Sequence, residues 1–113
     1  MNTATSLKPE IKKIVDTALQ YILSAGKPDK VFLFGSYARG EENEDSDMDF
    51  YIVEDLSIRK GSNAAKYYKA LFQLNHAKDI IVRSPTDFEK NKAILNTLEY
   101  DVYKEGIVLY ERK

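Results

Sequence analysis

The chain has 113 residues, which is enough for one hydrophobic core and too few for two ordinary domains, so we expect one domain over residues 1–113. Its 17 Lys and Arg against 18 Asp and Glu leave a net charge of -1, which argues against binding nucleic acid by bulk electrostatics. The absence of cysteine excludes disulfides and thiolate metal sites. Because neither a signal peptide nor a membrane-spanning run is visible, we expect a cytoplasmic protein without membrane contact.

The first predicted element is an amphipathic helix. Its apolar residues between Ile11 and Ile22 recur at three- and four-residue spacing. Pro9 suits the first turn of this helix, and Gly26 followed by Pro28 suits its end. We interpret it as a packing helix without a chemical role.

Short apolar runs then predict the strands. The first covers residues 31–34 and leads into a turn, and the second covers residues 47–53, after an acidic loop at 41–46. A third strand is predicted at 79–82 and a last short one at 107–110. No repeat or linker separates these elements, so the sequence predicts one α/β or α+β domain.

Two further helices are predicted between and after these strands. Residues 64–75 form the first, and the second begins around Pro85, with Thr86 and Glu89 at capping-box spacing and Gly106 as its stop. Its apolar face would consist of Ile94, Leu95, Leu98 and Val102. The tyrosines of the apolar segments are expected to pack in the core or at an interface, and they are Tyr67, Tyr68, Tyr100, Tyr103 and Tyr110.

Gly35 and Ser36 follow the first strand directly. A glycine at such a turn lets the backbone approach a ligand closely. If a short helix begins here, its free N–H groups and the Ser36 hydroxyl suit a phosphate group. Gly-Ser turns are common, so this feature does not assign a site by itself.

Carboxylates open the second and third strands. Asp47 and Asp49 are two residues apart, so they project to one face, where they repel each other unless a cation lies between them or one is protonated. Mg²⁺ prefers such oxygen ligands, although an isolated Asp-x-Asp is also common at a solvated strand end. If the third strand lies beside the second, Asp79 would face the same pocket and either complete a metal site or accept a proton.

The combination is more specific than its parts. Gly35-Ser36-x-Ala38-Arg39-Gly40, then six residues, then Asp47-x-Asp49 and an apolar strand resembles the signature of the DNA polymerase β-like nucleotidyltransferase superfamily. Within it, the chain is similar to the minimal nucleotidyltransferases (MNT proteins), stand-alone catalytic domains that usually have a HEPN-domain partner. The strand at 79–82 and the tail at 104–110 also resemble the corresponding segments of that family.

The resemblance implies a small mixed β-sheet flanked by helices. It also implies transfer of a nucleoside monophosphate, AMP from ATP, to a hydroxyl acceptor. Gly35 and Ser36 would bind the triphosphate, and Arg39 would support the phosphate or the loop. Mg²⁺ would be the metal, with Mn²⁺ as an alternative. The catalytic carboxylates and metal ligands would be Asp47, Asp49 and Asp79.

The acceptor is left open by the sequence. The resemblance implies a hydroxyl on a partner HEPN-type toxin, which would make the chain the antitoxin of a hetero-oligomeric complex. One alternative is a non-catalytic binding module that neutralises its partner by contact. Another is transfer to a small molecule or to RNA, although no additional substrate domain is visible and the charge balance gives RNA little support. The clustered carboxylates favour an enzyme, because a pure binder does not need them.

Overall fold

The computed structural model describes residues 2–3, 7–55 and 63–112. The strands in these segments form one mixed sheet with the order β1-β5-β2-β3-β4. Strand β2 runs antiparallel to both β3 and β5, whereas β4 runs parallel to β3 and β1 runs parallel to β5. The strands are β1 (Asn2–Thr3), β2 (Lys30–Phe34), β3 (Met48–Val53), β4 (Lys78–Arg83) and β5 (Ile107–Glu111).

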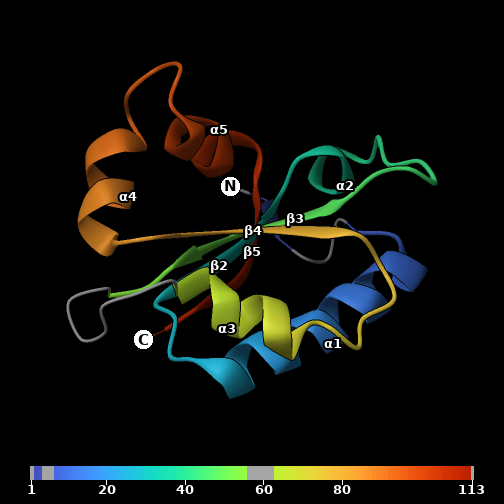
Figure 1. The fold of residues 1–113 in the computed structure, drawn as a ribbon. Helices are drawn as coiled ribbons and strands as arrows, with labels where there is room; N and C mark the ends of the chain where they lie inside the picture. The colour runs from blue at the N-terminus through green and yellow to red at the C-terminus, as the bar shows by residue number, and fades with distance from the viewer. Residues whose placement is uncertain (1, 4–6, 56–62, 113) are drawn as a thin grey trace.

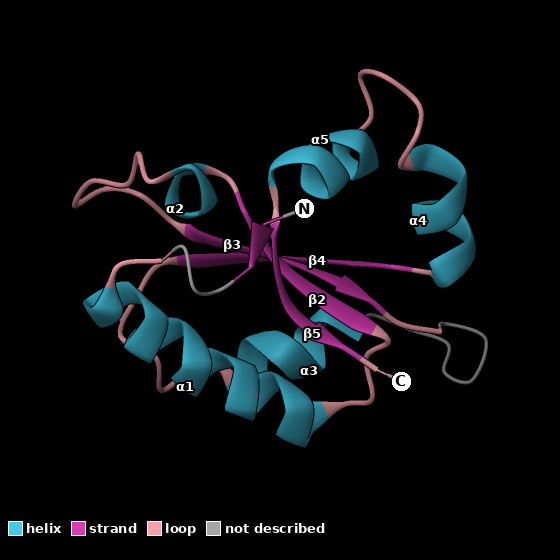
Figure 2. Ribbon diagram, turned by 180° about the vertical axis from the view of Figure 1, so that it is seen from behind, coloured by secondary structure: helices cyan, strands magenta, loops and turns pink. Residues whose placement is uncertain are grey.

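Helices cover both faces of this sheet (Figure 1). Helices α1 (Pro9–Ala25) and α3 (Asn63–Ala70) lie on one face, and α4 (Pro85–Asn91) and α5 (Leu98–Glu105) lie on the other, as the view from behind also shows (Figure 2). The short helix α2 (Ser36–Arg39) lies against β2 and β3. This architecture confirms the predicted α/β fold with a small mixed sheet flanked by helices. No helix in the described segments has the length and apolar character needed to cross a membrane.

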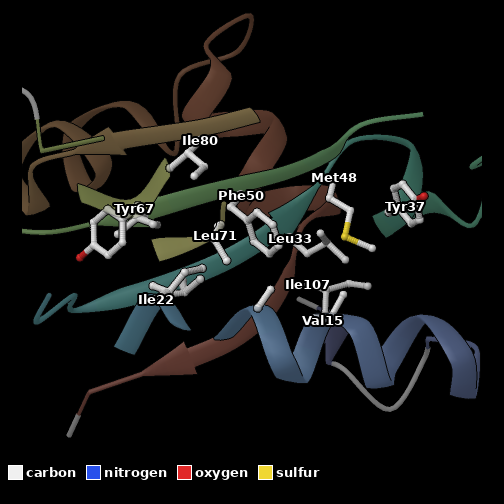
Figure 3. Close-up of a cluster of buried hydrophobic side chains, with 13 residues drawn as sticks. Val15, Ile22, Leu33, Tyr37, Met48, Phe50, Tyr67, Leu71, Ile80 and Ile107 are labelled. Carbon is white, nitrogen blue, oxygen red and sulfur yellow. The ribbon is translucent and has the colours of Figure 1, made fainter. Parts of the chain in front are cut away.

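Apolar side chains form a separate cluster on each face of the sheet. Along β3, Phe50 and Ile52 belong to the cluster that packs against α1 and α3, which Figure 3 shows in close-up. Tyr51 and Val53 belong to the cluster on the opposite face, beneath α4 and α5. Because successive side chains of a strand alternate between faces, Asp49 lies on the same face as Tyr51.

The prediction of a single helix after β4 is wrong. The structure has two helices there, and Asn96 between them has a positive φ of 71°. A left-handed residue cannot continue a right-handed helix, and Thr97 caps the start of α5 by accepting a hydrogen bond from the Tyr100 amide at 3.0 Å. Ile94 and Leu95 therefore lie in the connection, where they are 46% and 65% exposed, instead of forming part of an apolar face.

The predicted capping box at the start of α4 is also wrong. Ser84 is the N-cap, and its hydroxyl accepts a hydrogen bond from the Asp87 amide at 3.1 Å. Thr86 is already inside the helix, so its pairing with Glu89 has no capping role. The other deviations are small: α3 ends at Ala70 instead of Asn75, and the two-residue strand β1 was not predicted.

Candidate active site

The core of the candidate site is a pair of carboxylates on neighbouring strands. Asp49 of β3 and Asp79 of β4 are register partners in the parallel ladder. On its other side, Asp49 is the register partner of Phe34, the last residue of β2, which leads directly into the turn at Gly35. The pairing of β3 with β4, on which the predicted position of Asp79 depended, is thus present.

The three predicted carboxylates interact electrostatically. Burial raises the pKa of Asp49 above its usual range, and the negative charges of Asp79 and Asp47 raise it further, while the Arg39 guanidinium opposes this shift. Asp47 lies one residue before β3 and is exposed, as is Asp79, whereas Asp49 is half-buried. Asp49 is therefore the carboxylate whose negative charge is opposed both by burial and by its neighbours.

Gly35 is shaped to accommodate the Asp49 carboxylate. Its φ of 76° and ψ of -154° lie in a region that is essentially limited to glycine. A Cβ atom at this position would lie 2.2 Å from Asp49 Oδ2, much closer than atoms can approach. Only glycine therefore allows the turn after β2 to pass directly over the carboxylate.

Ser36 begins the short helix α2, as the sequence predicted for a helix start at this turn. Tyr37 anchors the helix, because it is 7% exposed and belongs to the apolar cluster beneath α1 and α3. Gly40 ends the helix in a left-handed conformation with φ 73°. This packing fixes the backbone of Ser36 directly after Gly35, whose turn lies against Asp49, although Ser36 as a phosphate ligand remains a prediction.

Arg39 is directed toward neighbouring acids. Its Nε donates a hydrogen bond to Glu41 Oε1 at 2.6 Å, and its Nη1 lies 3.7 Å from a Glu105 carboxylate oxygen. Both partners are exposed, so these ion pairs add little to stability. The contacts agree with a role of Arg39 in supporting the loop, and its predicted contact with phosphate remains a prediction.

The acidic loop between the two halves of the motif has local order. The Asn43 amide donates to Ser46 Oγ at 2.9 Å, and the Asp45 amide donates to Asn43 Oδ1 at 2.8 Å. Such side-chain to backbone bonds hold a turn without burial of apolar groups. The loop is mostly exposed, as the sequence predicted, and it returns the chain to Asp47 at the start of β3.

Asp79 has a partner that the sequence did not indicate. Tyr68 of α3 donates a hydrogen bond from its hydroxyl to Asp79 Oδ1 at 2.9 Å. The adjacent Tyr67 is fully buried in the core, whereas Tyr68 is 39% exposed and lies outside the buried core, so for Tyr68 only the predicted interface position stays a prediction. Both tyrosines lie in one apolar helical segment, and no local signal distinguishes the one that reaches the sheet edge.

The donor set of the site fits a divalent metal bound together with a nucleotide. Among the described residues, no group of three Asp, Glu, His or Cys side chains is arranged to hold a metal ion by itself. Mg²⁺ is usually held by one or two carboxylates plus substrate phosphates, and not by a complete protein cage. The oxygens of Asp47 and Asp49, next to the Gly35 turn, fit this mode of binding.

Comparisons with known proteins identify the family of the chain. The family described as "Polymerase beta, Nucleotidyltransferase" matches residues 12–113. A relative from Methanocaldococcus jannaschii named "Putative protein adenylyltransferase MJ0604" is 38% identical over 85 residues, covering 75% of this chain and 81% of the relative. A second, "Putative protein adenylyltransferase MJ0141" from the same organism, is 48% identical over 82 residues, covering 72% and 75%.

A solved structure shares the fold. It is described as a "putative nucleotidyltransferase" from Sulfolobus solfataricus and superposes with a TM-score of 0.56 at 20% sequence identity. The match covers 88% of this chain and 79% of that one. From the family match, which spans most of the chain, and from the two archaeal relatives, we conclude that the chain belongs to the DNA polymerase β-like nucleotidyltransferase superfamily, as its motif predicts.

Proposed function

We propose that this nucleotidyltransferase is a metal-dependent protein adenylyltransferase, which transfers AMP from ATP to a hydroxyl group of a partner protein. The observation that carries the proposal is the register pairing of Asp49 with Asp79, with the Gly35 turn packed against the Asp49 carboxylate. Family membership gives the reaction class, and the arrangement of these residues gives each of them a role in it.

The chain's own residues would bind and orient the reactants. The Gly35 turn and the Ser36 hydroxyl would bind the triphosphate, while Asp47 and Asp49 would hold Mg²⁺ or Mn²⁺. When bound, the cation would neutralise phosphate charge and lower the pKa of an attacking hydroxyl. Asp79 would lie beside the attacking oxygen, as a further ligand or as the group that accepts its proton.

The reaction is an in-line substitution at the α-phosphorus. The acceptor oxygen forms a bond to phosphorus, the bond to the β-phosphate oxygen breaks, and pyrophosphate leaves. The proton of the acceptor hydroxyl passes to a carboxylate of the site. The protein contributes mainly by positioning the groups, as is usual in transfers of this type.

Two observations support the choice of donor and acceptor. Both archaeal relatives are named as protein adenylyltransferases, which favours ATP as donor and a protein as acceptor. The similarity to minimal nucleotidyltransferases favours a HEPN-domain toxin as that protein, with this chain as its antitoxin in a complex of the two. Modification of a toxin hydroxyl would then be the means of neutralisation.

A neutralisation assay separates this function from inhibition by contact alone. The chain and its Asp47→Asn, Asp49→Asn variant would each be co-expressed with the product of the adjacent gene as the candidate toxin, and growth and complex formation would be measured. We expect the double variant to form the complex and fail to neutralise. An Asp101→Asn variant, which changes an exposed carboxylate of α5, should neutralise normally. Full neutralisation by the double variant would instead identify a contact inhibitor.

A further inference from the structure

The hydroxyl of Tyr68 connects the candidate site to the free edge of the sheet. Strand β4 is the last strand of the sheet order, so in the part of the chain that the structure describes, one side of its backbone has no neighbouring strand. The Ile80 amide donates a hydrogen bond to the Tyr68 hydroxyl at 2.9 Å, and this hydroxyl in turn donates to Asp79 Oδ1 at 2.9 Å. One side chain of α3 thus contacts both the backbone of β4 and the carboxylate beside Asp49.

The first of these bonds fixes the direction of the second. A phenol hydroxyl carries a single proton, and its oxygen accepts hydrogen bonds. Because the Tyr68 oxygen accepts from a backbone amide whose position is set by the sheet, its own proton is directed to Asp79. Asp79 Oδ1 therefore has a defined acceptor role, and within the described residues the other carboxylate oxygen has no hydrogen-bond partner.

Packing does not explain why a tyrosine is present at this position. Tyr68 is 39% exposed, whereas the adjacent Tyr67 is completely buried in the apolar cluster. Asp79 is itself exposed, and an exposed aspartate on an edge strand is free to change its rotamer unless another group holds it. The hydrogen bond from Tyr68 supplies this constraint.

We propose that Tyr68 is a positioning residue, which holds the Asp79 carboxylate in the orientation needed for nucleotidyl transfer. The inference rests on the proposed function, because it assigns Tyr68 a role through a carboxylate of that site. Residues that orient the reacting groups of a metal site typically change activity by about 10- to 100-fold when they are removed. We expect Tyr68→Phe to lower kcat by about this factor, with little change in the KM for ATP.

The first test compares two Tyr→Phe variants in the transfer assay. Tyr68→Phe removes only the hydroxyl, and Tyr100→Phe makes the same change on α5, on the opposite face of the sheet. The inference expects a loss of kcat in the first variant and none in the second. A wild-type kcat for Tyr68→Phe would overturn it, as would AMP found attached to Tyr68 itself, since that residue would then be an acceptor.

A double-mutant cycle tests whether the effect passes through Asp79. Asp79→Glu keeps a carboxylate and displaces it from the Tyr68 hydroxyl. If Tyr68 acts by holding Asp79, then Tyr68→Phe should lower kcat much less in the Asp79→Glu background than in the wild type. Equal fold losses in both backgrounds would mean that Tyr68 acts independently of Asp79, and would overturn the inference.

Amide hydrogen exchange tests the Tyr68 hydrogen bonds without measuring catalysis. Amide hydrogen exchange of the nucleotide-free protein should become faster at Ile80 in Tyr68→Phe, because its amide loses a partner, while the rest of β4 keeps its protection. Unchanged exchange at Ile80 would overturn the inference.

Asp49→Asn distinguishes a failure of the proposed function from a failure of the inference about Tyr68. If this variant still transfers AMP, the proposed function fails, whatever Tyr68→Phe does. If Asp49→Asn is inactive and Tyr68→Phe retains full kcat, only the inference fails.

Discussion

Asp49 and Asp79 face each other as register partners on the parallel strands β3 and β4, and the charge of Asp79 helps to raise the pKa of Asp49. Like charges on directly paired residues repel each other and so oppose folding, and the partial burial of Asp49 adds a desolvation cost. The fold nevertheless places the two carboxylates on neighbouring strands and places Gly35 against Asp49. This arrangement costs stability in the free protein, and in the proposed function it is the site that would bind a cation and phosphates.

The first prediction concerns the stability cost of the ionised Asp49 carboxylate. Because the folded-state pKa of Asp49 is raised above its usual value of 3.8, folding favours the protonated carboxyl. The contribution of Asp49 to stability therefore falls as pH rises from about 3.8 through the raised folded-state value, above which the full cost is present. We expect Asp49→Asn to stabilise the nucleotide-free protein at neutral pH by about 0.5–2 kcal/mol and to abolish transfer. Thermal unfolding across the pH range measures this, and a neutral-pH Tm below that of the wild type would contradict it.

The second prediction separates the two glycines of the motif that have positive φ. Gly35→Ala should destabilise by more than the about 1–3 kcal/mol of backbone strain, because its Cβ would also meet Asp49 Oδ2 at 2.2 Å. Gly40→Ala is the matched control, since its φ is 73° and a Cβ built there meets no atom of the described residues within 4 Å, apart from its chain neighbours. It should cost about 1–2 kcal/mol. Chemical denaturation measures both, and equal losses would show that the contact with Asp49 has no effect.

The third prediction compares two buried Tyr–Glu pairs. Tyr51 donates to Glu99 Oε2 at 2.7 Å, and burial together with this acceptor raises the pKa of Tyr51 above its usual value. Tyr67 donates to Glu54, which also accepts from Lys66 at 2.7 Å. Tyr51→Phe should cost about 1–3 kcal/mol, because Glu99 is only 6% exposed and loses its donor. Tyr67→Phe should cost less, since Lys66 still balances Glu54, and the reverse order in urea denaturation would refute this account.

Strands and motif were predictable because their signals are local. Apolar runs marked the cores of β2, β3, β4 and β5, and the spacing of Gly35, Asp47 and Asp49 carried the family resemblance. The position of Asp79 could be predicted only through that resemblance, because no local pattern determines which strands pair. The wrong predictions also concerned features that depend on tertiary contacts and not on local sequence.

The break between α4 and α5 shows why apolar periodicity is not sufficient. Ile94, Leu95 and Leu98 have helical spacing, so the sequence pattern continues across a connection that the backbone interrupts at Asn96. Asparagine tolerates the left-handed region, and Thr97 is a good cap, but neither signal is decisive without tertiary contacts. The hydrogen bond between Tyr68 and Asp79 could not be predicted for the same reason, since it joins a helix to a strand eleven residues later.

The most direct test of the proposed function is a labelling experiment. The purified chain would be incubated with Mg²⁺ and α-labelled ATP, GTP, CTP or UTP, with and without the product of the adjacent gene as candidate partner. The Asp47→Asn, Asp49→Asn variant would serve as control. We predict label on the partner from ATP alone and none with the double variant. Absence of label on the partner from every nucleotide, with tight binding that the double substitution leaves unchanged, would contradict adenylyl transfer and identify a module that acts by contact.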